Sequence, residues 1–415
     1  MTTYPYNQFY NYPVRYFTTG AFEFDFSYIH HLYLYEKESG PIVGDTGIEG
    51  LRLDFRAGLR LEVPAGDFHI QIADSDSGQI FLDEDLAEIT LISAEKYAIN
   101  WEVKVWERGC LVFSYALDLH GETVYFFLAG EAIGDTIGML EYIAEFSRFY
   151  GAKVVLKTPP LFLDIVQSYY PELTVATVPT DDIYIAYCLG VFELPPYTAP
   201  IDARRLTHDA MAMSLLNLPT RAEHRLYTPT VPRTIAEKYC CIAVQASGFC
   251  KRWHYPKGWD IVVAELRRQG YRVFCIDGEA TAEYHGYEHY QVRVPAGAED
   301  LTGRLPLMER VNLLAYADFF IGLGSGMSWL AWACGVPVVL ISGFSLTLGE
   351  FYTPYRVTNR LLCHGCFNDI TVNWKEECPK FKHTAREFEC SKKITPKMVL
   401  SAVKRAIADR EQSLC

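Results

Sequence analysis

The sequence predicts an α/β protein with two Rossmann-like domains, an antiparallel β domain before them and a four-cysteine segment after them. Three observations lead to this fold class. Apolar residues alternate along most of residues 50–127, as they do in antiparallel strands. Strand and helix patterns then alternate from residue 130 onward, which is typical of parallel sheets with right-handed crossovers. Finally, four cysteines gather between positions 363 and 390.

Length, composition and charge exclude several classes of protein. The chain has 415 residues, enough for about two or three domains, and half of them are apolar, so it can bury a core. A net charge of -13 disfavours nucleic acid and anionic membranes as partners. The N-terminal residues lack a basic head followed by an apolar stretch, and no apolar run is long enough to span a bilayer. We therefore expect a cytoplasmic protein without a secretory signal or a membrane span.

The first part of the chain is predicted as two units. Residues 1–45 are rich in tyrosine and phenylalanine without a clean period, which predicts an irregular arm or edge strands packed on another element. Residues 46–122 carry the alternating runs, separated by turns such as Asp-Ser-Gly and His-Gly. They predict a small antiparallel barrel or sandwich.

Two strand–helix halves follow. Residues 123–235 form the first Rossmann-like domain, beginning with a strand that ends near Gly130 and an amphipathic helix over 134–151. A polar stretch from about 193 to 236 contains several prolines and reads as a connection between the halves. Residues 236–360 form the second such domain. The four-cysteine segment then occupies 361–392, and a helix is expected over 393–415.

Asp135 is the first candidate for a functional group. It follows Gly134 in the loop that joins a strand to a helix, and ligands of doubly wound sheets bind at the carboxyl ends of strands. Its carboxylate can therefore project into a cleft and act on a proton. The alternative is an aspartate that caps the following helix.

The loop after the next predicted strand, residues 244–253, is the second candidate. Small residues there, including Ser247, permit close approach of a ligand, and Lys251 supplies a cation that can compensate a diphosphate. The alternative for Lys251 is an ordinary solvated lysine.

A glycine-rich loop is the third candidate, because it lies between a strand and a helix. In that context the amides of the helix N-terminus bind phosphate. Gly324 and Gly326 allow close approach, while Ser325 and Ser328 can add hydroxyl donors. The alternative is a tight turn that needs glycine only for packing.

The four cysteines predict a metal site. Cys363 and Cys366 form a Cys-x2-Cys pair, and Cys378 and Cys390 can complete a tetrahedral shell of thiolates. Four thiolates leave no open position, so the site would be structural. The chemistry favours zinc, although a sulfur tetrad also accepts iron. The other eight cysteines are scattered and read as reduced core residues, as expected in a long chain without a secretory signal.

Several motifs of this chain resemble a known family. Residues 300–307 (DLTGRLPL), GLGSGMSWLAWACGVP and Lys251-Arg252-Trp253 resemble bacterial heptosyltransferases of GT-B architecture. The β domain, the stretch VVLISGFSLTLGEFYTPYRV and the four cysteines resemble more closely the autotransporter heptosyltransferases. This likeness covers about residues 50–395. One departure is clear: lipopolysaccharide heptosyltransferases usually carry Asp-Thr-Gly and a later His, where this chain has Gly324-Ser325-Gly326 and Trp329.

The resemblance implies an inverting glycosyltransferase that moves heptose from ADP-heptose to serine hydroxyls of an autotransporter adhesin. The first Rossmann-like domain would serve the acceptor and the second the nucleotide sugar. It implies Asp135 as the catalytic base, donor contacts from Lys251 and the glycine-rich loop, and no divalent cation at the diphosphate. It also implies one structural iron per chain on the cysteines, and assembly into a homo-oligomer such as a dodecameric ring.

Three alternatives remain open on the sequence. The first is a lipopolysaccharide-type heptosyltransferase, which would work at a lipid surface, although the chain shows no basic amphipathic helix. The second is a glycosyltransferase that uses another nucleotide sugar. The third is a non-catalytic chaperone that holds adhesin strands with its β domain.

Overall fold

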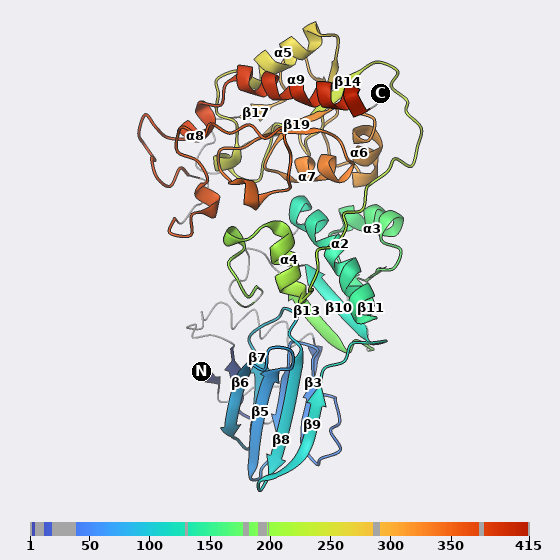
Figure 1. Ribbon diagram of the computed structural model, residues 1–415, viewed down its shortest axis with the longest axis vertical. Coiled ribbons are helices and arrows are strands. Elements are labelled where there is room, and N and C mark those ends of the chain that lie inside the picture. Colours follow the sequence, from blue (N-terminus) through green and yellow to red (C-terminus); the bar gives the residue numbers. More distant parts are fainter. Residues whose placement is uncertain are drawn as a thin grey trace.

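The protein is built in three tiers along its long axis, as a computed structural model shows (Figure 1). The structure describes residues 2–4, 12–18, 39–128, 132–176, 182–189, 197, 199–284, 291–372 and 377–413. The β domain forms one end, the first α/β domain lies in the middle, and the second α/β domain forms the other end with the C-terminus (Figure 1).

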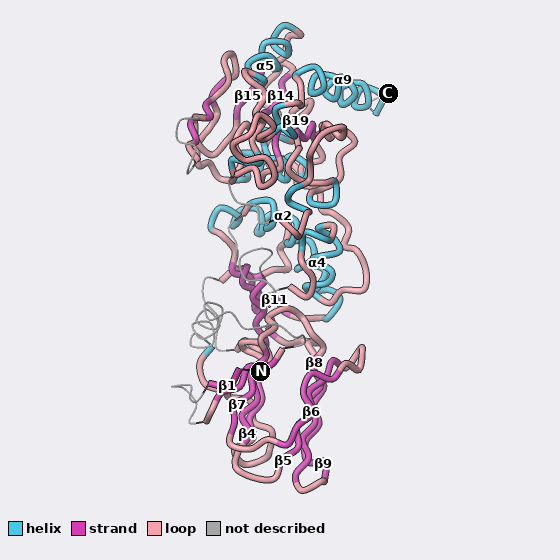
Figure 2. The backbone as a smooth tube through the Cα atoms, turned by 90° about the vertical axis from the view of Figure 1, so that its left-hand side faces the viewer, coloured by secondary structure: helices cyan, strands magenta, loops and turns pink. Residues whose placement is uncertain are grey.

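The β domain is a sandwich of two sheets that face each other across a core (Figure 2). One sheet has the order β1-β2-β7-β4-β3 and the other the order β6-β5-β8-β9. Apolar side chains alternate into the core along β5 and β8, as the sequence pattern predicts. Two strands from the aromatic arm, β1 and β2, extend the first sheet, and β2 pairs in parallel with β7. The strands are β1 (Thr2–Tyr4), β2 (Val14–Phe17), β3 (Arg52–Asp54), β4 (Arg60–Val63), β5 (Phe68–Asp74), β6 (Ile80–Asp85), β7 (Ile89–Ser93), β8 (Trp101–Glu107) and β9 (Cys110–Ala116).

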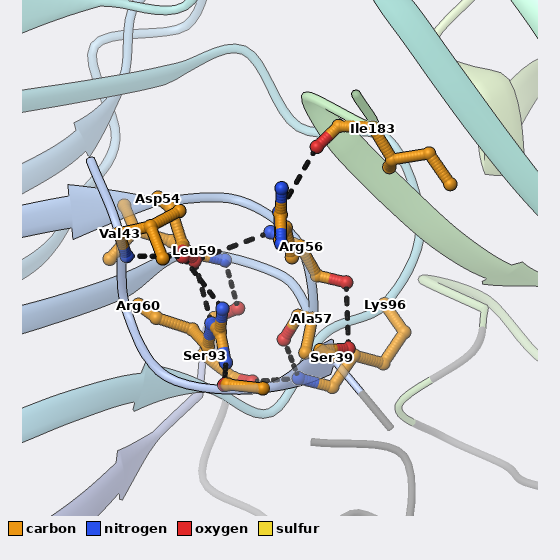
Figure 3. Close-up of polar contacts among 11 residues, drawn as sticks. Ser39, Val43, Asp54, Arg56, Ala57, Leu59, Arg60, Ser93, Lys96 and Ile183 are labelled. Carbon is orange, nitrogen blue, oxygen red and sulfur yellow. Dashed lines mark hydrogen bonds and ion pairs between the residues drawn. The ribbon is translucent and has the colours of Figure 1, made fainter. Parts of the chain in front are cut away.

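A polar network joins the β domain to the first α/β domain (Figure 3). The buried Arg60 guanidinium binds both carboxylate oxygens of Asp54, with Nε–Oδ1 and Nη2–Oδ2 distances of 2.6 Å. The neighbouring Arg56 donates from Nε to the carbonyl of Ile183 at 3.2 Å, across the domain boundary. A parallel bridge between Phe55 and Ile185 adds a backbone contact at the same place. The Arg56 bond and the Phe55–Ile185 bridge thus connect the β domain to the first α/β domain.

The first α/β domain contains a parallel sheet of four strands in the order β12-β11-β10-β13. Its helix α2 (Ile133–Tyr150) buries apolar residues on the sheet and ends at Gly151, whose positive φ of 63° suits glycine. The connection to the second domain contains a helix that the sequence analysis did not predict, α4 (His208–Leu216), which packs on α2. Its start is set by Thr207, which accepts a hydrogen bond from the amide of Ala210. The other elements are β10 (Thr123–Leu128), β11 (Lys153–Lys157), α3 (Leu163–Tyr169), β12 (Thr174–Val175) and β13 (Ile185–Leu189).

The second α/β domain contains a parallel sheet of five strands in the order β18-β15-β14-β19-β20. The predicted strands and helices of this half are present, and α9 (Pro396–Ser413) follows them. Among the described helices, none combines the length and apolar character needed to cross a membrane. The main elements are β14 (Tyr239–Ile242), α5 (Gly258–Arg268), β15 (Arg272–Cys275), β18 (Glu299–Asp300), α6 (Leu307–Leu314), β19 (Phe320–Leu323), α7 (Gly326–Ala333) and β20 (Val338–Ile341).

Candidate active site

A cleft of about 610 Å³ lies between the two α/β domains, at the carboxyl ends of their parallel strands. This is where ligands of open α/β sheets bind. The first domain contributes the N-terminus of α2, and the second contributes the loops after β14, β15, β19 and β20. Six of the predicted site residues line the cleft: Asp135, Ser247, Lys251, Gly324, Ser325 and Gly326.

Two glycines allow the domains to meet at this cleft. A Cβ atom on Gly134 would lie 2.6 Å from Cδ1 of Trp329, and one on Gly326 would lie 2.5 Å from Cβ of Ile133. Both distances are shorter than real carbon contacts. Glycine at these two positions therefore lets the N-termini of α2 and α7 approach each other, which places the first-turn residues of both helices on one cleft.

Asp135 is half-buried in the first turn of α2 and lines the cleft. The residue that caps α2 is Ala132, and no side-chain capping bond is made there. The interpretation of Asp135 as a helix cap is therefore wrong. The preceding loop residues 129–131 lie outside the described residues. An aspartate in the first turn of a helix is still favoured by the helix dipole.

Ser247 and Lys251 lie together on the opposite side of the cleft. Lys251 ends the short helix η3 (Phe249–Lys251), and its ammonium group donates to the Ser247 hydroxyl at 3.2 Å. The two side chains thus present a cation and a hydroxyl to the same part of the cleft.

In the glycine-rich loop, Gly324, Ser325 and Gly326 line the cleft, whereas Ser328 does not. The Ser325 hydroxyl is buried and has no partner among the described residues, although Ser325 lines the cleft. The amide of Ser328 donates to the carbonyl of Ser325 at 3.0 Å, which leaves the amides of Gly326 and Met327 as the first-turn donors of α7 that face no helical carbonyl. Ser328 is fully buried and donates its hydroxyl to the carbonyl of Leu323 at 2.6 Å. The prediction of Ser328 as a donor contact is therefore wrong, because its hydroxyl secures the end of β19.

Among the titratable groups in the cleft wall, the sequence analysis missed Asp277 and His208. Asp277 follows β15 and accepts amide bonds from Val244 at 2.8 Å and Gln245 at 3.1 Å. Burial raises the pKa of Asp277 to about 6, against the lowering effect of those amides. Burial also lowers the pKa of His208 to about 4, so its imidazole is neutral at pH 7 and packs on Trp329. Asp277 could have been found from its position after a predicted strand. No feature of the sequence pointed to His208.

The four predicted metal ligands lie in one region but do not form a ready cluster. The pKa of Cys390 is raised to about 12, first by burial and then by the thiols of Cys366, Cys363 and Cys378. The pKa of Cys366 is raised to about 11, again by burial first and then by Cys363. In the described ranges, however, no three His, Cys, Asp or Glu side chains converge at metal-binding positions. The structure thus brings the four thiols near one another without showing a metal finger.

This cysteine segment reaches the cleft from two sides. Phe367, in the short helix η5 (Cys366–Asn368), lines the cleft. Its neighbour Asn368 donates from Nδ2 to the carbonyl of Arg204, in the connection from the first domain, at 2.8 Å. The orange and red segment that carries α8 (Glu389–Lys392) flanks the second domain in Figure 1.

The second contact of the cysteine segment is made with the backbone that follows Lys251. The buried Ser391 donates its hydroxyl to the carbonyl of Arg252 at 2.6 Å and accepts the amide of His254 at 2.8 Å. The His254 ring also stacks on Phe388, with ring centroids 4.3 Å apart. The segment that follows Lys251 in the chain is thus fixed by the residues around Cys390.

Two family descriptions match parts of the chain. Residues 47–109 match the N-terminal domain of glycosyltransferase TibC, which corresponds to much of the β sandwich. Residues 208–379 match glycosyltransferase family 9 (heptosyltransferase), which spans the second α/β domain and part of the cysteine segment.

Curated relatives match most of the chain. It is 36% identical to the autotransporter heptosyltransferase BAHTCr of Citrobacter rodentium, over 86% of this chain and 90% of the relative. The autotransporter heptosyltransferase TibC of Escherichia coli H10407 is also 36% identical, over 87% and 90%. A third relative, from Burkholderia thailandensis, is 30% identical over 86% of each chain and is named an inactive autotransporter heptosyltransferase, BimC.

Solved structures of TibC superpose closely on this fold. A crystal structure of TibC, described as an iron-containing dodecameric glycosyltransferase, matches 90% of this chain and 99% of TibC with a TM-score of 0.83. A second structure, of TibC in complex with ADP-D-beta-D-heptose, matches with a TM-score of 0.82 over 90% of this chain and 98% of TibC.

Proposed function

Because this chain belongs to the autotransporter heptosyltransferase family, we propose that it transfers heptose from ADP-heptose to serine hydroxyls of an autotransporter adhesin, with inversion at the anomeric carbon. The observation that carries the proposal is the composition of the cleft. An aspartate from the first α/β domain shares it with a lysine and a glycine-rich helix N-terminus from the second.

The proposed mechanism uses Asp135 as general base. Its carboxylate accepts the serine proton while the serine oxygen forms a bond to the anomeric carbon. The bond from that carbon to the β-phosphate oxygen breaks, and its electron pair leaves with ADP. Lys251, the Ser247 and Ser325 hydroxyls and the first amides of α7 balance the growing negative charge. With this compensation the diphosphate needs no divalent cation.

The test is transfer by the purified wild-type protein. Incubation with ADP-heptose and an adhesin passenger domain should add the mass of heptose to the passenger, as intact mass spectrometry would detect. Addition of a sugar from another nucleotide sugar instead would overturn the donor assignment.

Absence of both transfer and donor hydrolysis would favour the chaperone alternative. Transfer to a lipopolysaccharide core but not to the passenger would favour the lipopolysaccharide-type enzyme. Because one relative is named inactive, activity of this chain must be measured directly.

We also propose that Cys363, Cys366, Cys378 and Cys390 hold one iron ion per chain, with zinc as the alternative. Support comes from the donor set of four thiols, none of which is in a disulfide. Besides burial, the neighbouring thiols raise the pKa of Cys366 and of Cys390. Such thiols ionise readily only around a cation. Bound there, the metal would cross-link a segment with few strands and helices of its own. The iron-containing TibC structure supports iron over zinc.

Assembly and location are proposed on similar grounds. The dodecameric TibC structure supports a homo-oligomeric ring for this chain, which light scattering would test. A reducing cytoplasm fits the cysteines, since those in the described part of the chain form no disulfide. Modification would then precede export of the adhesin.

Lys251→Ala should weaken ADP binding and lower turnover. A charge-assisted hydrogen bond contributes about 1.5–3 kcal/mol, so the dissociation constant for ADP should rise by about one to two decades. Isothermal titration calorimetry measures this directly. Lys397→Ala, an exposed lysine on α9, is the matched control and should bind ADP like the wild type. If ADP affinity and turnover were unchanged in Lys251→Ala, Lys251 would be an ordinary solvated lysine with no role in donor binding.

Ser391→Ala should loosen the loop that carries Lys251. The change removes the partner of the Arg252 carbonyl and the His254 amide, and leaving such buried groups unsatisfied costs about 1–3 kcal/mol. We expect a lower free energy of unfolding together with weaker ADP binding. Ser391→Thr keeps the hydroxyl and should preserve both. An alanine variant with wild-type stability and ADP affinity would show that the cysteine segment does not support the loop.

A further inference from the structure

A carboxylate that the sequence analysis did not select lies in the cleft wall beside the glycine-rich loop. It belongs to Glu350, which lines the cleft after the short helix η4 (Thr347–Gly349). A Cβ atom built on Gly324 would fall 2.0 Å from Oε1 of Glu350. The carboxylate therefore occupies the space that a side chain at position 324 would fill.

This carboxylate is held in place from behind. Arg356 donates from Nη1 to Oε2 of Glu350 at 2.5 Å, and the Ser345 hydroxyl donates to Oε1 at 2.8 Å. Arg356 is itself fixed by bonds from Nη2 to the Ser342 hydroxyl at 2.9 Å and the Ser345 carbonyl at 2.7 Å. Both charged side chains are almost fully buried, at 9% and 8% exposed. The ion pair and the hydroxyl bond fix the carboxylate of Glu350, and each of its oxygens retains capacity to accept another hydrogen bond.

Gly324 leaves room beside the glycine-rich loop for this carboxylate, which comes from a later loop of the chain. Glycine at 324 is thus a requirement of the geometry, since any side chain would displace Oε1 of Glu350.

We propose that Glu350 is a specificity-determining residue that accepts hydrogen bonds from hydroxyl groups of the donor sugar. A buried carboxylate repels a diphosphate, so the part of the ligand beside it must offer hydrogen-bond donors. In a sugar nucleotide, the ribose and the transferred sugar both flank the diphosphate and offer hydroxyls. We assign Glu350 to the transferred sugar, and an equal loss of ADP and ADP-heptose binding in its variants would assign it to the ribose instead. The cations and amides for the diphosphate are supplied by Lys251 and α7, so Glu350 completes the cleft with the acceptor that a polyol needs. This inference rests on the proposed function.

The test compares two ligands that differ only in the sugar. Glu350→Gln keeps the shape and removes the charge, so binding of ADP should stay within about twofold of the wild type. Binding of ADP-heptose should weaken by about tenfold to a hundredfold, as expected for loss of a charge-assisted bond. Calorimetry gives both constants, and the Michaelis constant for ADP-heptose should rise in parallel. The control is Glu265→Gln, which breaks an ion pair with Arg268 on the surface of α5 and should leave the binding of both ADP and ADP-heptose unchanged.

Glu350→Gln leaves the buried Arg356 without its ion-pair partner, so this variant can fail to fold. A second variant therefore tests the same prediction without that risk. The double variant Glu350→Gln, Arg356→Gln removes both charges of the buried pair, so that no unpaired cation remains. It should reproduce the selective loss of ADP-heptose binding with ADP binding retained. If either folded variant bound both ligands like the wild type, or lost both equally, the role of Glu350 in sugar recognition would be overturned. Failure of the wild type to use ADP-heptose would instead overturn the proposed function itself.

Discussion

Asp135→Asn is expected to lower the rate of heptose transfer by about 100- to 10,000-fold, the usual cost of removing a general base. The amide has nearly the same shape but cannot accept the serine proton. Folding should change little, since the N-cap of α2 is Ala132 and a charge in the first turn of a helix contributes about 0.3–1 kcal/mol. Initial rates at saturating ADP-heptose, measured by mass spectrometry of the passenger, give the size of the effect.

A matched control separates the base from the helix charge. Asp164 lies in the first turn of α3, in the same domain but outside the cleft, and its side chain is exposed. Asp164→Asn removes the same kind of first-turn carboxylate and should retain wild-type turnover. ADP affinity should be retained in both variants, because Asp135 acts on the acceptor. Near-normal turnover of Asp135→Asn at saturating donor would remove it from the catalytic role.

Cys378→Ser is expected to abolish metal binding and to unfold the cysteine segment. Structural zinc binding in small peptides contributes about 10–16 kcal/mol of apparent free energy, so loss of one thiolate should be severe. Cys378 is buried, and the segment around it has only the short helices η5 and α8 within its described residues. Elemental analysis should find about one metal ion per wild-type chain and far less in the variant. Iron would support the autotransporter family pattern, and zinc the generic structural site.

The cysteine variant should also affect the cleft. Phe367 lines the cleft, and Ser391 next to Cys390 holds the loop that carries Lys251. ADP binding should therefore weaken when the segment unfolds. Cys110→Ser, on an exposed position of β9, should leave metal content, solubility and ADP affinity unchanged. A wild-type protein purified without chelator that contains no metal, with all four thiols reactive, would refute the metal site.

Much of the architecture followed from periodicity alone. Alternation with period two and strand–helix repetition are local consequences of burying one face of a strand or helix, so the sandwich and the two parallel sheets were accessible from the pattern. The loops after β14 and β19 were equally accessible, because parallel strands send their carboxyl ends to one edge of the sheet. What the pattern missed was α4, whose apolar run is short and lies in a stretch that otherwise reads as polar and rich in proline.

The chemistry of individual side chains depended on the tertiary structure. The sequence indicated that Asp135, Lys251 and Ser325 belong to connections between a strand and the following helix, where a ligand can meet them. It could not decide that Ser328 turns its hydroxyl to Leu323, because that depends on which face of α7 packs inward. Nor could it bring Glu350 beside Gly324, since the two residues come from different loops and only the packing of β19 against β20 makes them neighbours. Sequence spacing fixes which element a residue belongs to, whereas three-dimensional packing fixes what its side chain touches.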